Sequence, residues 1–127
     1  MKRLIVLLPL ALLTCTVPFA HATSAEEMVS NCKQLADAKV SGKTIMLPQD
    51  FDTGVCWGAF TTLFAATHVI ASPNPEPVLK VCMPDEATAT EFVQIFMAYT
   101  KQHPEKLHLD YFRVSVIALQ QAFPCHK

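Results

Sequence analysis

Residues 51–70, FDTGVCWGAFTTLFAATHVI, decide the fold of this chain. Apolar side chains recur there at helical spacing, and Asp52 is the only charged residue. The pattern predicts a helix that begins near Phe51 or Asp52 and ends before Ser72. Because this segment is apolar on most sides, we expect it to be the central helix of an all-α bundle.

Gly54 and Gly58 lie one turn apart on this predicted helix. Without side chains they would let another backbone approach closely, and the same face would suit a possible homodimer. The alternative is that the two glycines only mark a fraying helix start. The chain has one other glycine, Gly42, and apolar and polar residues never alternate for long, so we expect helices rather than strands.

A first helix is predicted from Ser24 to Ala38. Ser24 is the expected N-cap, and Glu26 and Glu27 place negative charge in the first turn, where it interacts favourably with the helix dipole. Residues 39–49 are expected to form a loop. The inward residues of this helix are expected to be Met28, Cys32 and Leu35.

Residues 72–77, SPNPEP, predict a stiff, extended loop, because each proline disfavours the helical conformation of the residue before it. The next helix has the clearest start, a capping box formed by Thr88 and Glu91. It should end at His103-Pro104. Its inward stripe is expected to be Phe92, Ile95, Phe96 and Tyr99.

A fourth helix is predicted from Asp110, its N-cap, to just before Pro124. Its inward residues are expected to be Phe112, Val116, Leu119 and Phe123. The fold class that follows is all-α, a small bundle of four main helices.

The first residues are typical of a Sec signal peptide: a basic start, an apolar run over residues 4–13, and the small-residue site Ala20-His21-Ala22. We expect cleavage of residues 1–22 after Ala22, which leaves residues 23–127 as a single helical domain in the periplasm. A lipoprotein anchored at Cys15 is the alternative, but the threonine directly before this cysteine fits such sites poorly.

The predicted mature chain contains Cys32, Cys56, Cys82 and Cys125. An even set in an oxidising compartment indicates disulfides rather than zinc, since no two form a C-x-x-C pair. Sequence alone allows three connectivities. If consecutive helices pack antiparallel, Cys32 faces Cys56 and Cys82 meets Cys125, and we predict these two pairs. Trp57 is expected to pack against the first disulfide, the alternative being an anchor for a partner protein.

Composition argues against two kinds of partner. Without residues 1–22 the chain has 8 Lys and Arg against 11 Asp and Glu, a net charge of about −3. This balance does not favour nucleic acid. No basic amphipathic segment indicates a membrane-surface role after removal of the signal peptide.

Candidate catalytic and metal-binding groups are few. His103 and His108 bracket a proline turn, and we interpret them as solvated helix-end and loop residues rather than metal ligands. His68 is interpreted as a partly buried, hydrogen-bonded histidine rather than a catalyst, and Asp85 and Glu86 as negative charge suited to a helix start. Nothing has the spacing of a nucleophile with its base or of a metal cluster. We therefore expect no enzymatic activity, no cofactor and no metal.

Four short patterns follow one another along the chain: GVCWG at 54–58, VCMP at 81–84, HPEKLH at 103–108 and AFPC at 122–125. Together they resemble the Rap/Tai family of type VI secretion amidase immunity proteins. The resemblance implies a small periplasmic helical protein, often dimeric, that binds a toxic cell-wall-degrading effector and blocks its active site without a reaction of its own. Two departures, Ala59 after Gly58 and Asp110-Tyr111 at the fourth helix, bear on the partner rather than on the fold.

The leading hypothesis is a periplasmic immunity protein that binds and blocks a type VI secretion effector of the peptidoglycan-hydrolase class. The alternative is a periplasmic acid-stress chaperone, which would expose apolar surface as its carboxylates are protonated, or another helical binding protein. An enzyme of unrecognised type is a third hypothesis. Effector contacts are expected in the proline loop and before the third helix, at Pro73, Asn74, Pro75, Glu76, Pro77, Lys80, Asp85 and Glu86.

Overall fold

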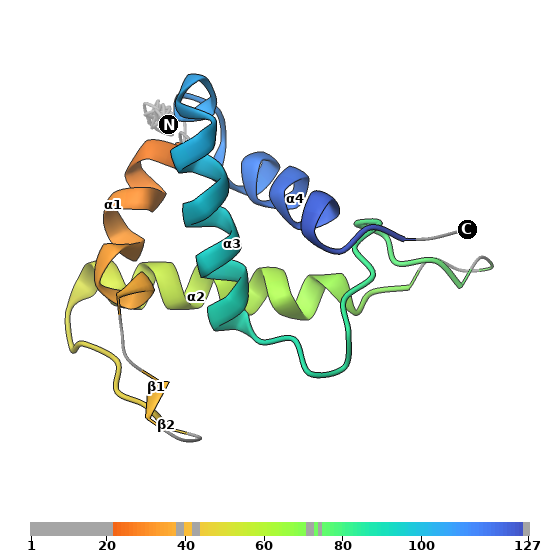
Figure 1. Cartoon of the computed structure of the whole chain (residues 1–127), viewed down its shortest axis with the longest axis horizontal. Helices are drawn as coiled ribbons and strands as arrows, with labels where there is room; N and C mark the ends of the chain where they lie inside the picture. Colours follow the sequence, from red (N-terminus) through yellow and green to blue (C-terminus); the bar gives the residue numbers. More distant parts are fainter. Residues whose placement is uncertain (1–21, 38–39, 42–43, 71–72, 74, 126–127) are drawn as a thin grey trace, which may run out of the picture.

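The computed structural model describes residues 22–37, 40–41, 44–70, 73 and 75–125. Within these ranges the chain forms four α-helices, which confirms the predicted all-α bundle (Figure 1). The predicted signal peptide lies outside the described residues, except for Ala22. None of the described helices is long and apolar enough to cross a bilayer. The helices are α1 (Ala25–Ala36), α2 (Phe51–Thr67), α3 (Ala89–Gln102) and α4 (Tyr111–Ala122), with a short 3₁₀ helix, η1 (Pro104–Lys106).

The segment predicted as a loop between α1 and α2 contains a minimal hairpin instead. β1 (Val40–Ser41) pairs with β2 (Thr44–Ile45) in antiparallel register. A strand of two residues is too short to show an alternation of apolar and polar side chains, so the sequence pattern did not predict these strands.

Each α-helix begins at a side chain that accepts a backbone hydrogen bond. Ser24 Oγ accepts from Glu27 N–H at 3.2 Å, and Thr88 Oγ1 accepts from Glu91 N–H at 3.2 Å. Asp110 caps α4 in the same way, as predicted. Asp50, which the sequence analysis did not single out, caps α2. These oxygens satisfy amides that would otherwise lack partners at the helix start.

Helix α3, rather than α2, lies in the middle of the bundle. It packs against α1, α2 and α4, whereas α2 packs mainly against α1 and α3 and runs across them (Figure 1). The expectation that α2 would be central was therefore wrong. Although α2 is apolar on most sides, one of its faces finds no partner within the described chain.

Aromatic rings connect three helices in the core. The Phe60 and Phe96 ring centroids lie 5.3 Å apart, and those of Phe64 and Phe92 lie 5.4 Å apart. Phe123, just after α4, is 6.2 Å from Phe92. Such tilted pairs add to the stabilisation gained by burying the rings. Of the predicted inward residues, Met28, Cys32, Leu35, Phe92, Phe96, Tyr99 and Leu119 are buried, and Ile95 is partly buried. Phe60 and Leu63 of α2 are buried as well.

The predicted inward face of α4 was partly wrong. Phe112 is 42 % exposed, and α4 buries Val114, Ser115 and Ala118 beside the predicted Leu119. The segment carries two overlapping apolar stripes, so periodicity alone does not select one. The smaller side chains at Val114 and Ala118 face inward, where they occupy less room between α4 and its neighbours.

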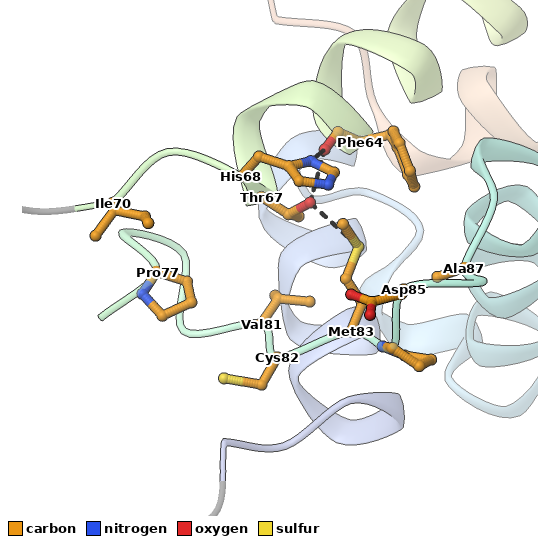
Figure 2. Close-up of a pocket in the computed structure, with 11 residues that line it drawn as sticks. Phe64, Thr67, His68, Ile70, Pro77, Val81, Cys82, Met83, Asp85 and Ala87 are labelled. Carbon is orange, nitrogen blue, oxygen red and sulfur yellow. Dashed lines mark hydrogen bonds between the residues drawn. The ribbon is translucent and has the colours of Figure 1, made fainter. Parts of the chain in front are cut away.

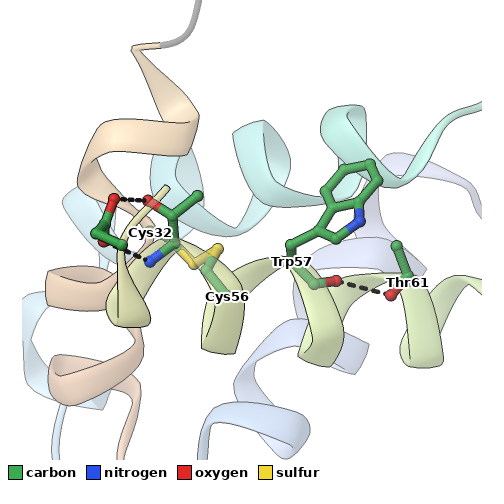
Figure 3. The surroundings of a disulfide bond; sticks show 6 residues. Cys32, Cys56, Trp57 and Thr61 are labelled. Atoms are coloured by element: carbon green, nitrogen blue, oxygen red, sulfur yellow. Dashed lines mark hydrogen bonds between the residues drawn. A yellow bond between two sulfur atoms is a disulfide. The ribbon is translucent and has the colours of Figure 1, made fainter. Parts of the chain in front are cut away.

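Both predicted disulfides are present. Cys32–Cys56 has an S–S distance of 2.04 Å and joins α1 to α2 (Figure 3). Cys82–Cys125 has an S–S distance of 2.02 Å. The cysteines of the first pair are fully buried, whereas those of the second are exposed. In the loop-entropy treatment, each crosslink contributes about 3 to 4 kcal/mol, a large share for a domain of this size.

Candidate functional site

The loop between α2 and α3 leaves the bundle beside the C-terminal end of α4 (Figure 1). Its base is closed by backbone pairing: Ile70 and Pro77 form an antiparallel bridge, and Val78 N–H donates to the Val69 carbonyl at 2.9 Å. The two arms of the loop are thus held together where they emerge from the domain.

A second set of contacts ties the outgoing arm to α4. Gln120 Nε2 donates to the Leu79 carbonyl at 2.9 Å, and Val81 pairs with Pro124. The Cys82–Cys125 disulfide closes the same junction. Lys80, between these contacts, adopts a left-handed conformation with a φ of 52°, which is uncommon for a residue with a side chain. Surrounding contacts hold this conformation in place.

Two pockets lie on either side of this anchored arm. The first, which we call the Met83 pocket, has a volume of about 370 Å³ and lies between the end of α2 and the start of α3 (Figure 2). The second, the cystine pocket, has a volume of about 480 Å³ and lies against the exposed disulfide. The Met83 pocket is lined by Phe64, Thr67, His68, Ile70, Pro77, Val81, Cys82, Met83, Pro84, Asp85 and Ala87. The cystine pocket is lined by Pro75, Glu76, Pro77, Lys80, Cys82, Gln120, Pro124 and Cys125.

The contact residues predicted from sequence are distributed over these pockets. Four of them, Pro75, Glu76, Pro77 and Lys80, line the cystine pocket. Asp85 lines the Met83 pocket together with Pro77. Pro73 and Glu86 are exposed but line neither pocket, and Asn74 lies outside the described residues.

Sequence reasoning missed the contributions of α2 and α4 to this surface. Ile70 was expected to belong to the apolar stripe of a helix, yet it follows the helix and is 61 % exposed. Gln120 sits 41 residues after Leu79, the residue whose carbonyl it binds. The prolines that follow Ile70 closely in the sequence could have indicated that the helix ends before it. No neighbouring residue in the sequence identifies Gln120 as a contact of the loop.

His103 and His108 occupy the kinds of position predicted for them, whereas His68 is hydrogen-bonded but exposed rather than partly buried. His103 Nδ1 lies 3.1 Å from Glu105 Oε1 at the end of α3, and its ring stacks on Tyr99 with centroids 4.4 Å apart. The pKa of Glu105 lies below its ordinary value, first because its own backbone N–H donates to the carboxylate and then because of His103. His108 is exposed. Among the described residues, no group of three His, Cys, Asp or Glu side chains is arranged to hold a metal ion.

Trp57 is half-buried, and its ring points away from the sulfur atoms of the neighbouring disulfide (Figure 3). It packs against the edge of the core and also lines a shallow hollow of about 340 Å³ with Leu47 and Phe51. Phe51 is 82 % exposed and Met46 is 79 % exposed. Trp57 therefore packs against the core but not against the disulfide, and its alternative role as an anchor for a partner protein stays a prediction.

Gly54 and Gly58 face open space. A Cβ atom added at either position would meet nothing within 4 Å, so no backbone approaches them within the described chain. The close approach predicted there is not made inside the described part of this protomer. The exposed positions continue along α2 at helical spacing and just past its end as Phe51, Gly54, Gly58, Thr62, Ala65 and Val69, a set that we call the open face of α2.

Comparison with known proteins gives one match. A sequence model described as "Rap1a immunity proteins" matches residues 24–125. No curated protein and no solved structure gives a significant match. The matched range covers all four helices and both disulfides.

Proposed function

Because the chain belongs to the Rap1a immunity protein family, we propose that it is a periplasmic immunity protein that blocks a type VI secretion effector of the peptidoglycan-hydrolase class. The family suggests an immunity protein for a type VI effector, and family and disulfides together suggest an exported protein. The periplasmic site of action and the class of effector are parts of the proposal.

The observation that carries the proposal is the anchoring of the α2–α3 loop. A protein that blocks an active site by insertion needs a projecting element that does not lose much conformational entropy on binding. Here the loop base is closed by the Ile70–Pro77 bridge, and the outgoing arm is held by Gln120 and by a disulfide. Such blocking is steric, so the proposal assigns no reaction to this chain.

Two features of the loop fit a binding surface. Its prolines restrict the backbone before any partner arrives. Exposed apolar side chains also gather at its base, where Val69 is 54 %, Ile70 is 61 % and Val78 is 54 % exposed. Apolar groups surrounded by polar ones are typical of surfaces that bind other proteins.

We also propose that the open face of α2 binds a second copy of the chain. No residue of this face is charged, and Asp52 is the only acidic or basic residue in α2. An isologous dimer brings identical surfaces together, and an uncharged face does so without placing like charges against each other. Gly54 and Gly58 supply the close approach that two helices need.

The test is protection of a bacterial host. A peptidoglycan hydrolase encoded beside this gene, directed to the periplasm, should lyse the cells, and co-expression of the full-length chain should restore growth. The purified pair should form a complex in which peptidoglycan hydrolysis stops. If no neighbouring hydrolase is bound or inhibited, the proposed function is wrong.

A shortened loop tests the blocking element itself. Since Ile70 and Pro77 already pair, residues 71–76 can be replaced by two glycines that close the hairpin. This variant should retain both disulfides and its helical circular dichroism, yet lose protection. Full protection by the shortened variant would contradict the role given to the loop.

An acid-stress chaperone is the second candidate, and the exposure of Met46 and Phe51 favours it. Such a chaperone would suppress the aggregation of unfolded client proteins in strong acid. The immunity proposal expects no suppression beyond that of a control protein of similar size, measured by light scattering at low pH.

A further inference from the structure

Two side chains that line the Met83 pocket, His68 and Thr67, already use a hydrogen-bond donor within the fold. His68 Nδ1 lies 3.0 Å from the Phe64 carbonyl, which can only accept, so Nδ1 carries the proton in the neutral ring. The other ring nitrogen, Nε2, is then an acceptor. The Thr67 hydroxyl already donates to the Phe64 carbonyl at 2.6 Å and also lies 3.3 Å from Met83 Sδ (Figure 2).

The Asp85 carboxylate gives the pocket its charge. Among the described residues Asp85 makes no ion pair, the one such contact being that of His103 with Glu105 elsewhere in the fold. It is not required as a helix cap, because Thr88 caps α3. Thr67 and His68 place the C-terminal end of α2 at the same pocket, and that end of a helix carries partial negative charge.

The remaining walls are apolar. Ile70, Val81 and Met83 line the pocket beside Phe64 and two prolines. Its volume of about 370 Å³ is near the lower end of the range of roughly 300 to 1,000 Å³ for small-molecule sites, which suits one long side chain. A side chain that suits both the walls and the acceptors has an aliphatic stem and a cationic head.

We propose that the Met83 pocket receives one arginine or lysine side chain of the bound effector, with its stem against Ile70, Val81 and Met83 and its head at Asp85. This proposal rests on the proposed function, because it gives the chemistry of the effector group that docks beside the loop. A carboxylate would be repelled by Asp85. A purely apolar side chain would displace water from that carboxylate without replacing the lost hydrogen bonds.

The pocket can be tested without knowing the effector. The probes are Nα-acetyl-arginine amide and Nα-acetyl-citrulline amide, which have nearly the same shape and differ in charge. Each is titrated into the purified protein while the Met83 methyl and the Thr67 amide are followed by NMR. The arginine probe should shift both signals saturably, and the citrulline probe should bind more weakly by up to about fivefold, the upper end of what an exposed charge pair contributes.

Asp85→Asn should reduce the response to the arginine probe to that of citrulline. The matched control is Asp37→Asn, which removes the same charge from an exposed residue at the end of α1. Equal binding of the two probes, or an unchanged response in Asp85→Asn, overturns the proposal.

The results distinguish a wrong assignment of the pocket from a wrong proposed function. If the chain inhibits its hydrolase but binds the arginine and citrulline probes equally well, only the assignment of the pocket is wrong. If the arginine probe binds more tightly than the citrulline probe but no hydrolase is bound, the pocket still prefers a cationic side chain and the proposed function is wrong.

Discussion

The backbone amide of Cys82 donates to the Phe123 carbonyl at 2.9 Å, so the chain before α3 is paired with the chain after α4. The disulfide from Cys82 to Cys125 closes the same junction two residues further along. These contacts make the outgoing arm of the loop part of the rigid body formed by α3 and α4. The two disulfides therefore have different structural roles. Cys82–Cys125 holds the outgoing arm of the loop, whereas Cys32–Cys56 lies inside the core between α1 and α2.

Removing the exposed disulfide should affect binding as well as stability. We expect Cys82→Ser with Cys125→Ser to lower the unfolding free energy by about 3 to 4 kcal/mol. It should also weaken effector binding at temperatures where the protein remains folded, because the loop arm gains freedom that binding must remove. Chemical denaturation and calorimetric titration measure the two effects.

The buried disulfide supplies the matched control. Cys32→Ser with Cys56→Ser should lower stability at least as much, because it also disturbs the core, and should leave the effector affinity of the folded fraction unchanged. Equal losses of affinity in the two double variants would mean that the exposed crosslink does not act through the loop.

Gln120 should stabilise the loop by a single hydrogen bond. Its side-chain amide donates to the Leu79 carbonyl at 2.9 Å, and we expect Gln120→Ala to cost about 1 kcal/mol. Hydrogen exchange should become faster at the amides of Lys80 and Val81. Gln121→Ala is the control, since Gln121 is exposed on the same helix and its loss should change stability by less than about 0.5 kcal/mol. Similar exchange in both variants would contradict the anchoring role.

Much of the fold was predictable because its signals are local. All four N-caps are polar residues just before apolar stripes, and three of them were predicted. The predicted disulfides followed from the positions of the cysteines at helix ends. The face of α4 was not predictable, because Phe112 and Val114 belong to competing stripes and packing against the rest of the bundle decides between them.

Only the part of the candidate site that lies in the α2–α3 loop was predictable from the sequence. The prolines and charges of the loop could be read from the sequence, but the pockets need partners from distant segments. Thr67 meets Met83 across 16 residues, and Gln120 meets Leu79 across 41. Such contacts depend on how the helices cross, which no single segment encodes.

The proposed dimer predicts a specific sensitivity on α2. Thr62 lies mid-way along the open face, where an added charge would meet its own copy across the two-fold axis. Thr62→Arg should therefore convert a dimer to a monomer in light scattering, with unchanged helical content. Gln94→Arg, an exposed position on α3, should leave the oligomeric state unchanged. A parent chain that is monomeric at high concentration would exclude this interface.

The cap of α2 predicts how stability changes with acid. Thr53 N–H donates to Asp50 Oδ1 at 2.9 Å and the Thr53 hydroxyl donates to Oδ2 at 2.8 Å, which lowers the pKa of Asp50 below its ordinary value of 3.8. A carboxyl whose pKa is lower in the folded state contributes stability above its unfolded pKa and loses it as the pH falls through the folded pKa. The loss should begin near pH 3.8 and continue below it.

Asp50→Asn isolates this contribution. The asparagine side chain can still accept the Thr53 amide but does not titrate, so the variant should have a shallower decline in stability below pH 3.8 than the parent. Denaturation at a series of pH values compares the two, and Asp52→Asn, an exposed residue with no side-chain contact described, serves as the control. Parallel pH profiles for Asp50→Asn and the parent would show that the cap does not titrate in this range. The decline in acid would then come from other carboxylates.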